Sequence, residues 1–336
     1  MKGVKAALVN PTPPINKYDE RPSVKELIEK HREAIGDVRQ GLSDDPLFDT
    51  SKHDDLWILR FVLSHKKKSK RAIQAAKDCL IFRNKYQLDK EDIRAYPPQT
   101  KGFTKSESFN EYRQYLTTDS FLVCIPDEQL GVICFVKYTG IDQHKLSQAC
   151  DDGVYSGTYR YISEWTHQWV DYITRTTGRL TKSTRFVDTQ GISMKHISYE
   201  NHHRDARAMG SMEDFYPQLL HCIYICNPPS WVQIPWRVIR ALAPKRVVSK
   251  VDFIDPRHNK QDLKKILAFI SLEHLPTQFG GKNEIWPASF PLPSDEMSET
   301  FSGSESDISL VASESQCQCR AALLYRGSLE MEESLI

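Results

Sequence analysis

The chain has 336 residues, of which 40% are hydrophobic and 26% charged, with a formal net charge of +1 at pH 7. This length can bury a large core, but none of the apolar runs reaches the roughly 20 residues that cross a bilayer. The apolar stub before the first prolines is shorter than the hydrophobic stretch of about 7–15 residues in a secretory signal. We therefore expect a protein of the cytoplasm.

Charge and cysteine usage narrow the class further. Residues 291–336 hold nine acidic and two basic residues, so this acidic, serine-rich tail carries −7 and the rest of the chain +8. The basic body suggests an anionic partner, and the tail is either regulatory or only solubilising. The eight cysteines lack the spacing of a zinc site or a disulfide scaffold, and several lie in apolar runs. Reduced core cysteines and no metal site are the expectation.

The first third of the chain predicts helices. Residues 1–22 are rich in proline and lack apolar periodicity, which favours a flexible segment. Apolar residues at helical spacing then predict helices over residues 23–40, 54–65 and 69–86. Ser51, with Asp54 three residues on, is typical of a helix N-cap. Residues 23–98 are thus expected to form a helical N-terminal module.

After Pro97 and Pro98 the pattern changes to α/β. Short apolar runs predict strands at 121–125, 132–138, 184–191, 221–227 and 249–255, the first two antiparallel. Helical patterns lie between and after them, at 151–178, 199–215, 231–242 and 261–272. Strands that alternate with helices predict right-handed crossovers and a mostly parallel sheet. We expect one α/β domain over residues 99–290 and a disordered tail over 291–336.

No motif indicates an enzyme or a cofactor. The sequence lacks a phosphate-binding loop, a dinucleotide fingerprint and a serine nucleophile elbow. The only histidine pair, His202 and His203, is adjacent, whereas metal ligands on a helix favour a spacing of four. The basic run 65–71 would suit nucleic acid or a solvated helix junction, and without clustered aromatics we expect no nucleic-acid partner.

The segment 227–244 is apolar on nearly all sides. Read as a helix from Ser230, its two apolar stripes are Trp231, Ile234, Val238 and Leu242, and Val232, Trp236, Ile239 and Ala243. Such a helix is either an ordinary core helix or a lid that faces a ligand on one side and lipid on the other. Two tryptophans and the internal Pro235, expected to break the helix, favour a movable lid. Lys245 and Arg246 follow directly, as expected where an apolar face meets anionic headgroups.

Five segments together resemble one known family. They are LRFVLSHK (59–66), TGRLTKSTRFVDTQGIS (177–193), FYPQLLHCIYICNPP (215–229), WRVIRALAP (236–244) and LPTQFGG (275–281). In this order and spacing they resemble the CRAL-TRIO lipid-binding proteins over about residues 25–285. Among these, the fungal-type phosphatidylinositol/phosphatidylcholine transfer proteins are the most similar.

The resemblance implies a fold and a function. It implies a helical module followed by an α/β domain whose sheet floors a hydrophobic pocket, closed by a gate helix at 230–243. Pocket and gate residues would be Trp165, Trp169, Phe186, Tyr224, Trp231, Ile234, Trp236, Val238, Ile239 and Leu242. The implied protein is a monomer with no catalytic residue, which binds a phospholipid or other hydrophobic ligand and exchanges it during transient, peripheral contact with membranes. Two alternatives stay open: a regulatory lipid-sensing scaffold without transfer activity, and a carrier of a retinoid, tocopherol or sterol.

The resemblance also implies a headgroup site, from which this sequence departs. Lys66 and Lys250 stand where the phosphatidylinositol-binding members have lysines, but Gln218 replaces a glutamate and Val247 a threonine. These two replacements remove a carboxylate and a hydroxyl that an inositol ring would use. If Lys66 and Lys250 do not bind a headgroup, they are simple surface charges. In the phosphatidylcholine site, Ser183 stands at the serine position and Arg185 replaces the threonine. Arg185 either points into the cavity, where it could hold a phosphate or carboxylate, or points outward as a surface charge.

Overall fold

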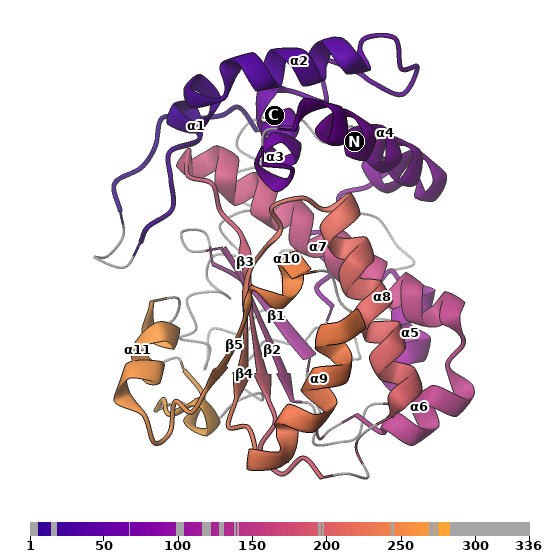
Figure 1. Ribbon diagram of the computed structural model, residues 1–336, viewed down its shortest axis with the longest axis vertical. Coiled ribbons are helices and arrows are strands. Elements are labelled where there is room, and N and C mark those ends of the chain that lie inside the picture. The colour runs from indigo at the N-terminus through magenta and orange to yellow at the C-terminus, as the bar shows by residue number, and fades with distance from the viewer. Residues whose placement is uncertain are drawn as a thin grey trace, which may run out of the picture.

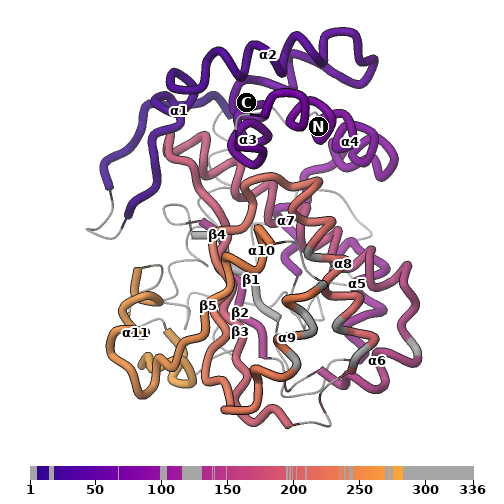
Figure 2. Tube along the Cα trace, in the orientation of Figure 1, coloured from indigo at the N-terminus to yellow at the C-terminus, as the bar shows by residue number. Residues whose placement is uncertain are grey.

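A computed structural model describes the protein at residues 6–14, 19–66, 68–98, 104–115, 122–127, 131–137, 139, 141–193, 196, 198–242, 245–268, 272 and 275–282. A helical N-terminal module lies across one end of an α/β domain, and the strand arrowheads of the parallel strands point away from this module (Figure 1). The Cα trace shows the same two-part arrangement (Figure 2). The acidic tail expected at 291–336 lies outside the described residues.

The N-terminal module consists of α1 (Val24–Lys30), α2 (Arg32–Leu42), α3 (Asp55–Ser64) and α4 (Ser69–Tyr86), followed by the 3-10 turn η1 (Leu88–Lys90). The predicted helix at 23–40 is divided at His31. Asp54, not Ser51, caps α3, because its side chain accepts from the backbone N–H of Trp57 at 3.0 Å. The Ser51 prediction is wrong, since that hydroxyl donates to Asp49 at 2.6 Å within the preceding turn.

The sheet of the second domain has five strands in sequential order: β1 (Leu122–Asp127), β2 (Gly131–Lys137), β3 (Ser183–Asp188), β4 (Leu220–Cys226) and β5 (Val251–Ile254). β1 and β2 are antiparallel, whereas β2 to β5 pair in parallel. The prediction of a mostly parallel sheet in an α/β fold is therefore confirmed.

Helices cover the two faces of the sheet unequally. α7 (Asp152–Thr177), α8 (Tyr199–Phe215) and α9 (Gln233–Leu242) lie on one face, with α5 (Glu107–Tyr112) and α6 (Gln143–Ala149) outside them (Figure 1). The short α10 (Lys245–Val248) leads into β5, and α11 (Lys260–Leu267) covers the other face. Further 3-10 turns are η2 (Arg113–Tyr115), η5 (Ser230–Val232) and η6 (Thr277–Phe279).

Alternation along the strands divides the core into two clusters. Val132 and Cys134 of β2 pack with Trp165 of α7 and Met212 of α8. Strand residues of the opposite parity, Phe135, Phe186, Tyr224 and Ile254, pack instead with Ile266 of α11 and Phe279 of η6. A side chain on β2 to β5 can thus be assigned to a face by its register.

Buried ion pairs and aromatic contacts join the module to the α/β domain. Arg83 of α4 donates two hydrogen bonds to Glu164 of α7, each 3.0 Å long. The rings of Phe82 and Phe215, from α4 and α8, stack with centroids 4.0 Å apart. Residues 6–14, which were expected to be flexible, lie alongside the C-terminal end of α7. The Val9 N–H donates there to the Arg175 carbonyl at 3.0 Å.

Two searches of the described residues bear on function. Within the ranges given above, no helix has the length and hydropathy needed to span a bilayer. Across the same described part of the chain, no group of three or more His, Cys, Asp and Glu side chains is arranged to hold a metal ion.

Candidate functional site

Three of the sequence motifs meet at the carboxyl ends of the parallel strands. Asp188, the last residue of β3, accepts from the Asn227 side chain at 2.9 Å and from the Gln190 backbone N–H at 3.1 Å. The same Asn227 nitrogen donates to the carbonyl of Gln278 at 3.1 Å. Hydrogen bonds of Asp188 and Asn227 therefore connect the turn after β3, the end of β4 and η6. The role of these two residues is structural.

The two glycines of LPTQFGG (275–281) allow the chain to pack closely at this same end of the sheet. Gly280 has a φ of 83°, in the left-handed region that favours glycine. A Cβ atom at Gly281 would lie 1.9 Å from the carbonyl oxygen of Leu275, which no side chain could accommodate. This motif allows the chain to fold back closely beneath the sheet.

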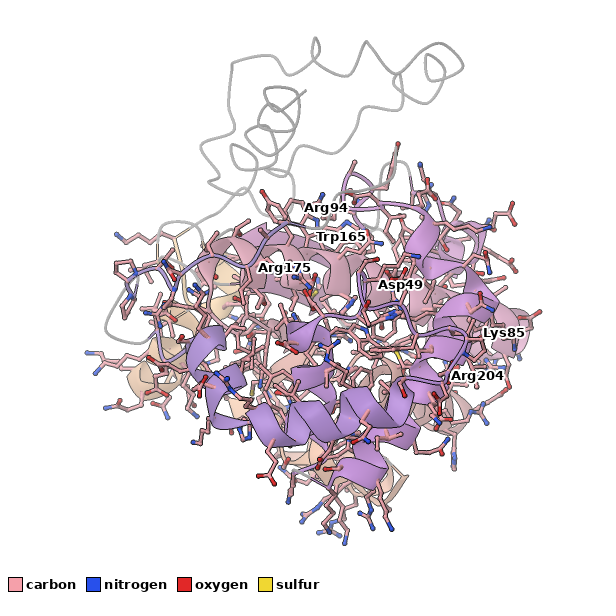
Figure 3. All side chains as sticks on the ribbon, turned by 90° about the horizontal axis from the view of Figure 1, so that it is seen from above. Asp49, Lys85, Arg94, Trp165, Arg175 and Arg204 are labelled. Atoms are coloured by element: carbon pink, nitrogen blue, oxygen red, sulfur yellow. The ribbon has the colours of Figure 1, made fainter. Side chains whose placement is uncertain are left out.

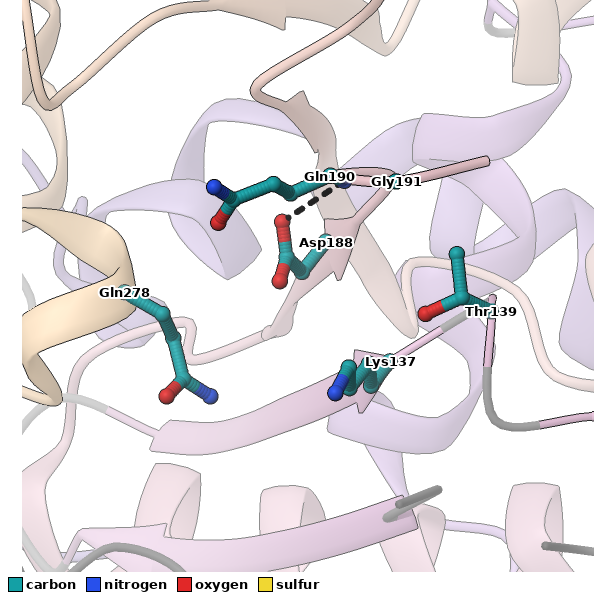
Figure 4. Close-up of a pocket in the computed structure, with 6 residues that line it drawn as sticks. All are labelled: Lys137, Thr139, Asp188, Gln190, Gly191 and Gln278. Atoms are coloured by element: carbon teal, nitrogen blue, oxygen red, sulfur yellow. Dashed lines mark hydrogen bonds between the residues drawn. The ribbon is translucent and has the colours of Figure 1, made fainter. Parts of the chain in front are cut away.

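A polar pocket of about 320 Å³ opens beside this closure (Figure 4). It is lined by Lys137, Thr139, Asp188, Gln190, Gly191 and Gln278. Lys137 and Asp188 are register partners on the face of the sheet that carries Phe135 and Phe186, away from α9. A pocket of this size, lined by an ammonium, a carboxylate and two carboxamides, does not suit acyl chains.

The segment expected to form a lid is the turn η5 followed by α9. The ring of Trp236 packs edge-on against Phe253 of β5, with centroids 5.5 Å apart. Phe253 pairs with Ile225 on the face opposite to Cys226 and Ile254, so α9 covers the same face as α8. α9 therefore lies over the part of the sheet formed by β4 and β5.

The expectation that Pro235 breaks this helix is wrong. α9 begins at Gln233, after the 3-10 turn, so Pro235 is its third residue. The N–H groups of the first turn have no acceptor within the helix, so a proline is tolerated there. The proline therefore gives no evidence of movement.

The described side chains of this segment differ in exposure. Ile234 is 60% exposed, Val232 is buried, and Trp231 and Trp236 are partly buried. The side chains of Val238, Ile239 and Leu242 lie outside the described set, although their backbone belongs to α9. A large apolar residue is thus presented to solvent next to basic residues, of which Arg237, Arg240 and Lys245 are exposed.

The four aromatic residues expected in the pocket, Trp165, Trp169, Phe186 and Tyr224, lie in two core clusters. Trp165 and Trp169 both donate their indole N–H to the carbonyl of Arg94, at 3.0 and 3.2 Å, and so fix α7 to the chain that leaves the module. Arg94 and Trp165 are labelled side by side in Figure 3. Phe186 and Tyr224 stack on each other in the cluster beneath α11, with centroids 5.3 Å apart. Their described packing does not place these four side chains against α9.

Ser183 and Arg185 of β3 lie on the face covered by α7 and α8. Their register partners are Val132 and Cys134, which belong to the cluster on that face. Ser183 is fully buried, and its hydroxyl donates to the Leu219 carbonyl at 3.0 Å. Arg185 approaches α8, with its Nη2 atom 3.4 Å from the sulfur of Met212. The guanidinium of Arg185 therefore points toward the interior.

The residues expected at the phosphatidylinositol position come from the junction of the two parts. Gln218 donates to the Ser64 hydroxyl at 3.0 Å, which places the α8–β4 turn against the end of α3. Lys66 follows on that end and is exposed. Lys250 forms an ion pair of 2.5 Å with Glu213 of α8, and Val247 is buried in α10. Arg246 is also paired, with Glu213 at 3.6 Å and with Asp214.

The structure adds two residues to this junction. Glu213, 5% exposed, supplies the carboxylate beside Lys250 that the glutamine at 218 lacks. Burial, together with the nearby charges of Lys250 and Arg60, lowers the pKa of Lys182 to about 8. No motif marks either residue, because Glu213 is 37 positions from Lys250 in the sequence and meets it only in the fold.

A helical module placed across one end of a largely parallel sheet, with α8 and α9 on one face, defines a class of two-part α/β proteins. Residues 117–281 match the family model of the CRAL/TRIO domain. The resemblance inferred from the motifs is thus confirmed over this part of the chain.

Two individual similarities accompany this match. The phosphatidylinositol/phosphatidylcholine transfer protein SFH4 of Arabidopsis thaliana is 26% identical over 99 residues, which are 30% of this chain and 16% of that relative. The alignment thus spans about a sixth of the relative's length. The crystal structure of Sfh5 superposes with a TM-score of 0.49 at 14% identity, covering 79% of this chain and 89% of that chain.

Proposed function

We propose that this protein binds a lipid between its sheet and the helices α8 and α9, and exchanges it at membrane surfaces. The CRAL/TRIO domain, a lipid-binding domain, supports the general activity. The similarity to a phosphatidylinositol/phosphatidylcholine transfer protein supports a phospholipid as the ligand. In this proposal α9 is the gate helix, and the protein acts without catalysis or a cofactor.

The observation that carries the proposal is the character of α9. It places the 60%-exposed Ile234 outside and Trp236 against Phe253 of the sheet. Burying one isoleucine side chain in lipid is worth about 1.5–3 kcal/mol, and neighbouring cations add attraction to anionic headgroups. Contact with a membrane would thus favour a position of α9 in which its apolar residues leave water and the ligand can pass.

The headgroup has two candidate places. Lys66 and Lys250, near Gln218, form the outer one, where Glu213 already neutralises much of the charge of Lys250. Ser183 and Arg185 form the inner one, on β3. Because the outer lysine is paired, we propose the inner place as the main contact of the headgroup.

Vesicle experiments with Ile234→Asp test the role of α9. The protein should accelerate transfer of a labelled phospholipid from donor to acceptor vesicles that contain anionic lipid. Ile234→Asp should bind those vesicles about tenfold more weakly and transfer more slowly, because a carboxylate replaces the apolar contact. Its unfolding free energy should change by less than about 0.5 kcal/mol, as for other exposed sites.

Ile81→Asp is the matched control, because Ile81 is 58% exposed on α4 in the N-terminal module. Equal vesicle binding by wild type and Ile234→Asp would contradict the role of α9. Lipid binding without any acceleration of transfer would instead favour a regulatory, lipid-sensing protein.

A further inference from the structure

Arg185 occupies an unusual position for a permanently charged side chain. It lies in the middle of β3, paired with Cys134 on β2 and Ile223 on β4. Cys134 is buried among Trp165 and Met212 on the face covered by α7 and α8. Arg185 projects from this face, and its Nη2 atom contacts the Met212 sulfur at 3.4 Å. The guanidinium therefore lies between the sheet and α8, in apolar surroundings.

No described residue neutralises this guanidinium. Its Nε atom is buried without a hydrogen-bond partner in the described part of the chain. No described carboxylate lies within ion-pair distance of it, and the thioether of Met212 is only a weak acceptor. Arg185 as a whole is partly exposed. Arg83 and Arg175, which are buried, differ from it because each forms ion pairs with two carboxylates.

The guanidinium of an arginine is a permanent cation in proteins, so this position always carries a positive charge. Its buried Nε atom has left water without gaining a partner in the described part of the chain, so this site favours a ligand that supplies an anion. The Ser183 hydroxyl, two residues earlier on the same face, already donates to a backbone carbonyl. Arg185 is therefore the main hydrogen-bond donor that β3 offers to a ligand here.

We infer that the lipid bound by this protein carries an acidic group, a carboxylate or a phosphate, which Arg185 holds inside the domain. The inference rests on the proposed lipid-binding function and narrows its ligand class. A sterol, tocopherol or retinol would leave the guanidinium unpaired. A phosphocholine headgroup would bring a second cation beside it, and no described carboxylate contacts Arg185 to receive that cation.

The test is a competition for lipid. The purified full-length protein is incubated with vesicles that contain phosphatidic acid, phosphatidylinositol, oleic acid, phosphatidylcholine and cholesterol in equal amounts, and bound lipid is identified by native mass spectrometry. Wild type should select the acidic lipids, and the identity of the bound species shows whether the group is a phosphate or a carboxylate. Arg185→Met should lose this preference by tenfold or more and take up neutral lipid instead, whereas Arg185→Lys should keep part of it.

The unfolding temperature provides a second measurement, and it distinguishes loss of the ligand contact from a failure of the variant to fold. Methionine removes the unpaired charge and fills a similar volume, so lipid-free Arg185→Met should unfold at the same temperature as wild type or higher. Arg207→Met is the control, because Arg207 is exposed on α8 and should change neither lipid selection nor stability.

The possible failures are distinguishable. If wild type selects phosphatidylcholine or cholesterol, and Arg185→Met selects the same lipid, the inference is overturned while lipid binding stands. A protein that takes up none of these lipids overturns the proposed function and this inference with it.

Discussion

Arginines that point into the fold differ in whether the described part of the chain supplies them with a carboxylate. Arg60 lies 3.3 Å from Asp171, Arg83 lies 3.0 Å from Glu164, and Arg175 lies 2.7 Å from Asp54. These three connect α3, α4 and α7, and their charges are neutralised within the fold. Arg185 lacks such a partner among the described residues. The paired arginines hold the two parts of the molecule together, and the unpaired one is the residue that we propose to contact a ligand.

His167 of α7 makes stability depend on pH. Burial, and then the charge of Arg83, lowers its pKa to about 4 from an ordinary value of 6.5. Below about pH 6.5 the unfolded chain therefore binds a proton that the folded protein does not. The free energy of unfolding therefore decreases as the pH falls from 6.5 toward 4, and it is about 2 kcal/mol lower at pH 4.5 than at pH 7.

Urea unfolding at pH 7 and pH 4.5 checks this expectation. His167→Gln should lose about 2 kcal/mol less than wild type between the two values. His144→Gln, at an exposed position of α6, should behave as wild type. An unchanged pH dependence in His167→Gln would show that other groups are responsible.

At the level of elements, the contact between α4 and α7 depends on one buried ion pair. Glu164 is 3% exposed and receives both hydrogen bonds from Arg83. Glu164→Ala leaves a buried guanidinium with only Asp89 as its partner, so the free energy of unfolding should fall by about 3 kcal/mol. Glu33→Ala, at an exposed position of α2, should change it by less than about 0.5 kcal/mol. Equal denaturant midpoints for the two variants would contradict this assignment.

The elements that the sequence predicted well are those with long periodic patterns. α4 and α8 have the predicted bounds, and the five strands lie where the apolar runs indicated them. α5, α6 and α10 were not predicted, because helices of four to seven residues depend on tertiary packing more than on local pattern. The site was less predictable. The inward direction of Arg185 follows from strand register, and the pairing of Lys250 with Glu213 follows from the packing of α8.

In the whole molecule, the two ends of the sheet carry different sets of residues. The end next to the N-terminal module gathers Lys182, Lys250 and Glu213, and buried ion pairs fix the module there. The opposite end is closed by Asp188, by Asn227 and by Gly280 and Gly281, which follow η6. Between them, α9 covers β4 and β5 and exposes Ile234. This arrangement fixes both ends and leaves α9 as the element through which we propose that lipid enters.

Identification of the lipid that accompanies the purified protein tests the central claim most directly. Native mass spectrometry of the full chain, followed by solvent extraction, gives the number and kind of bound molecules. We expect one lipid with an acidic headgroup in each protein molecule. A protein that is empty, and stays empty after incubation with mixed vesicles, would contradict it.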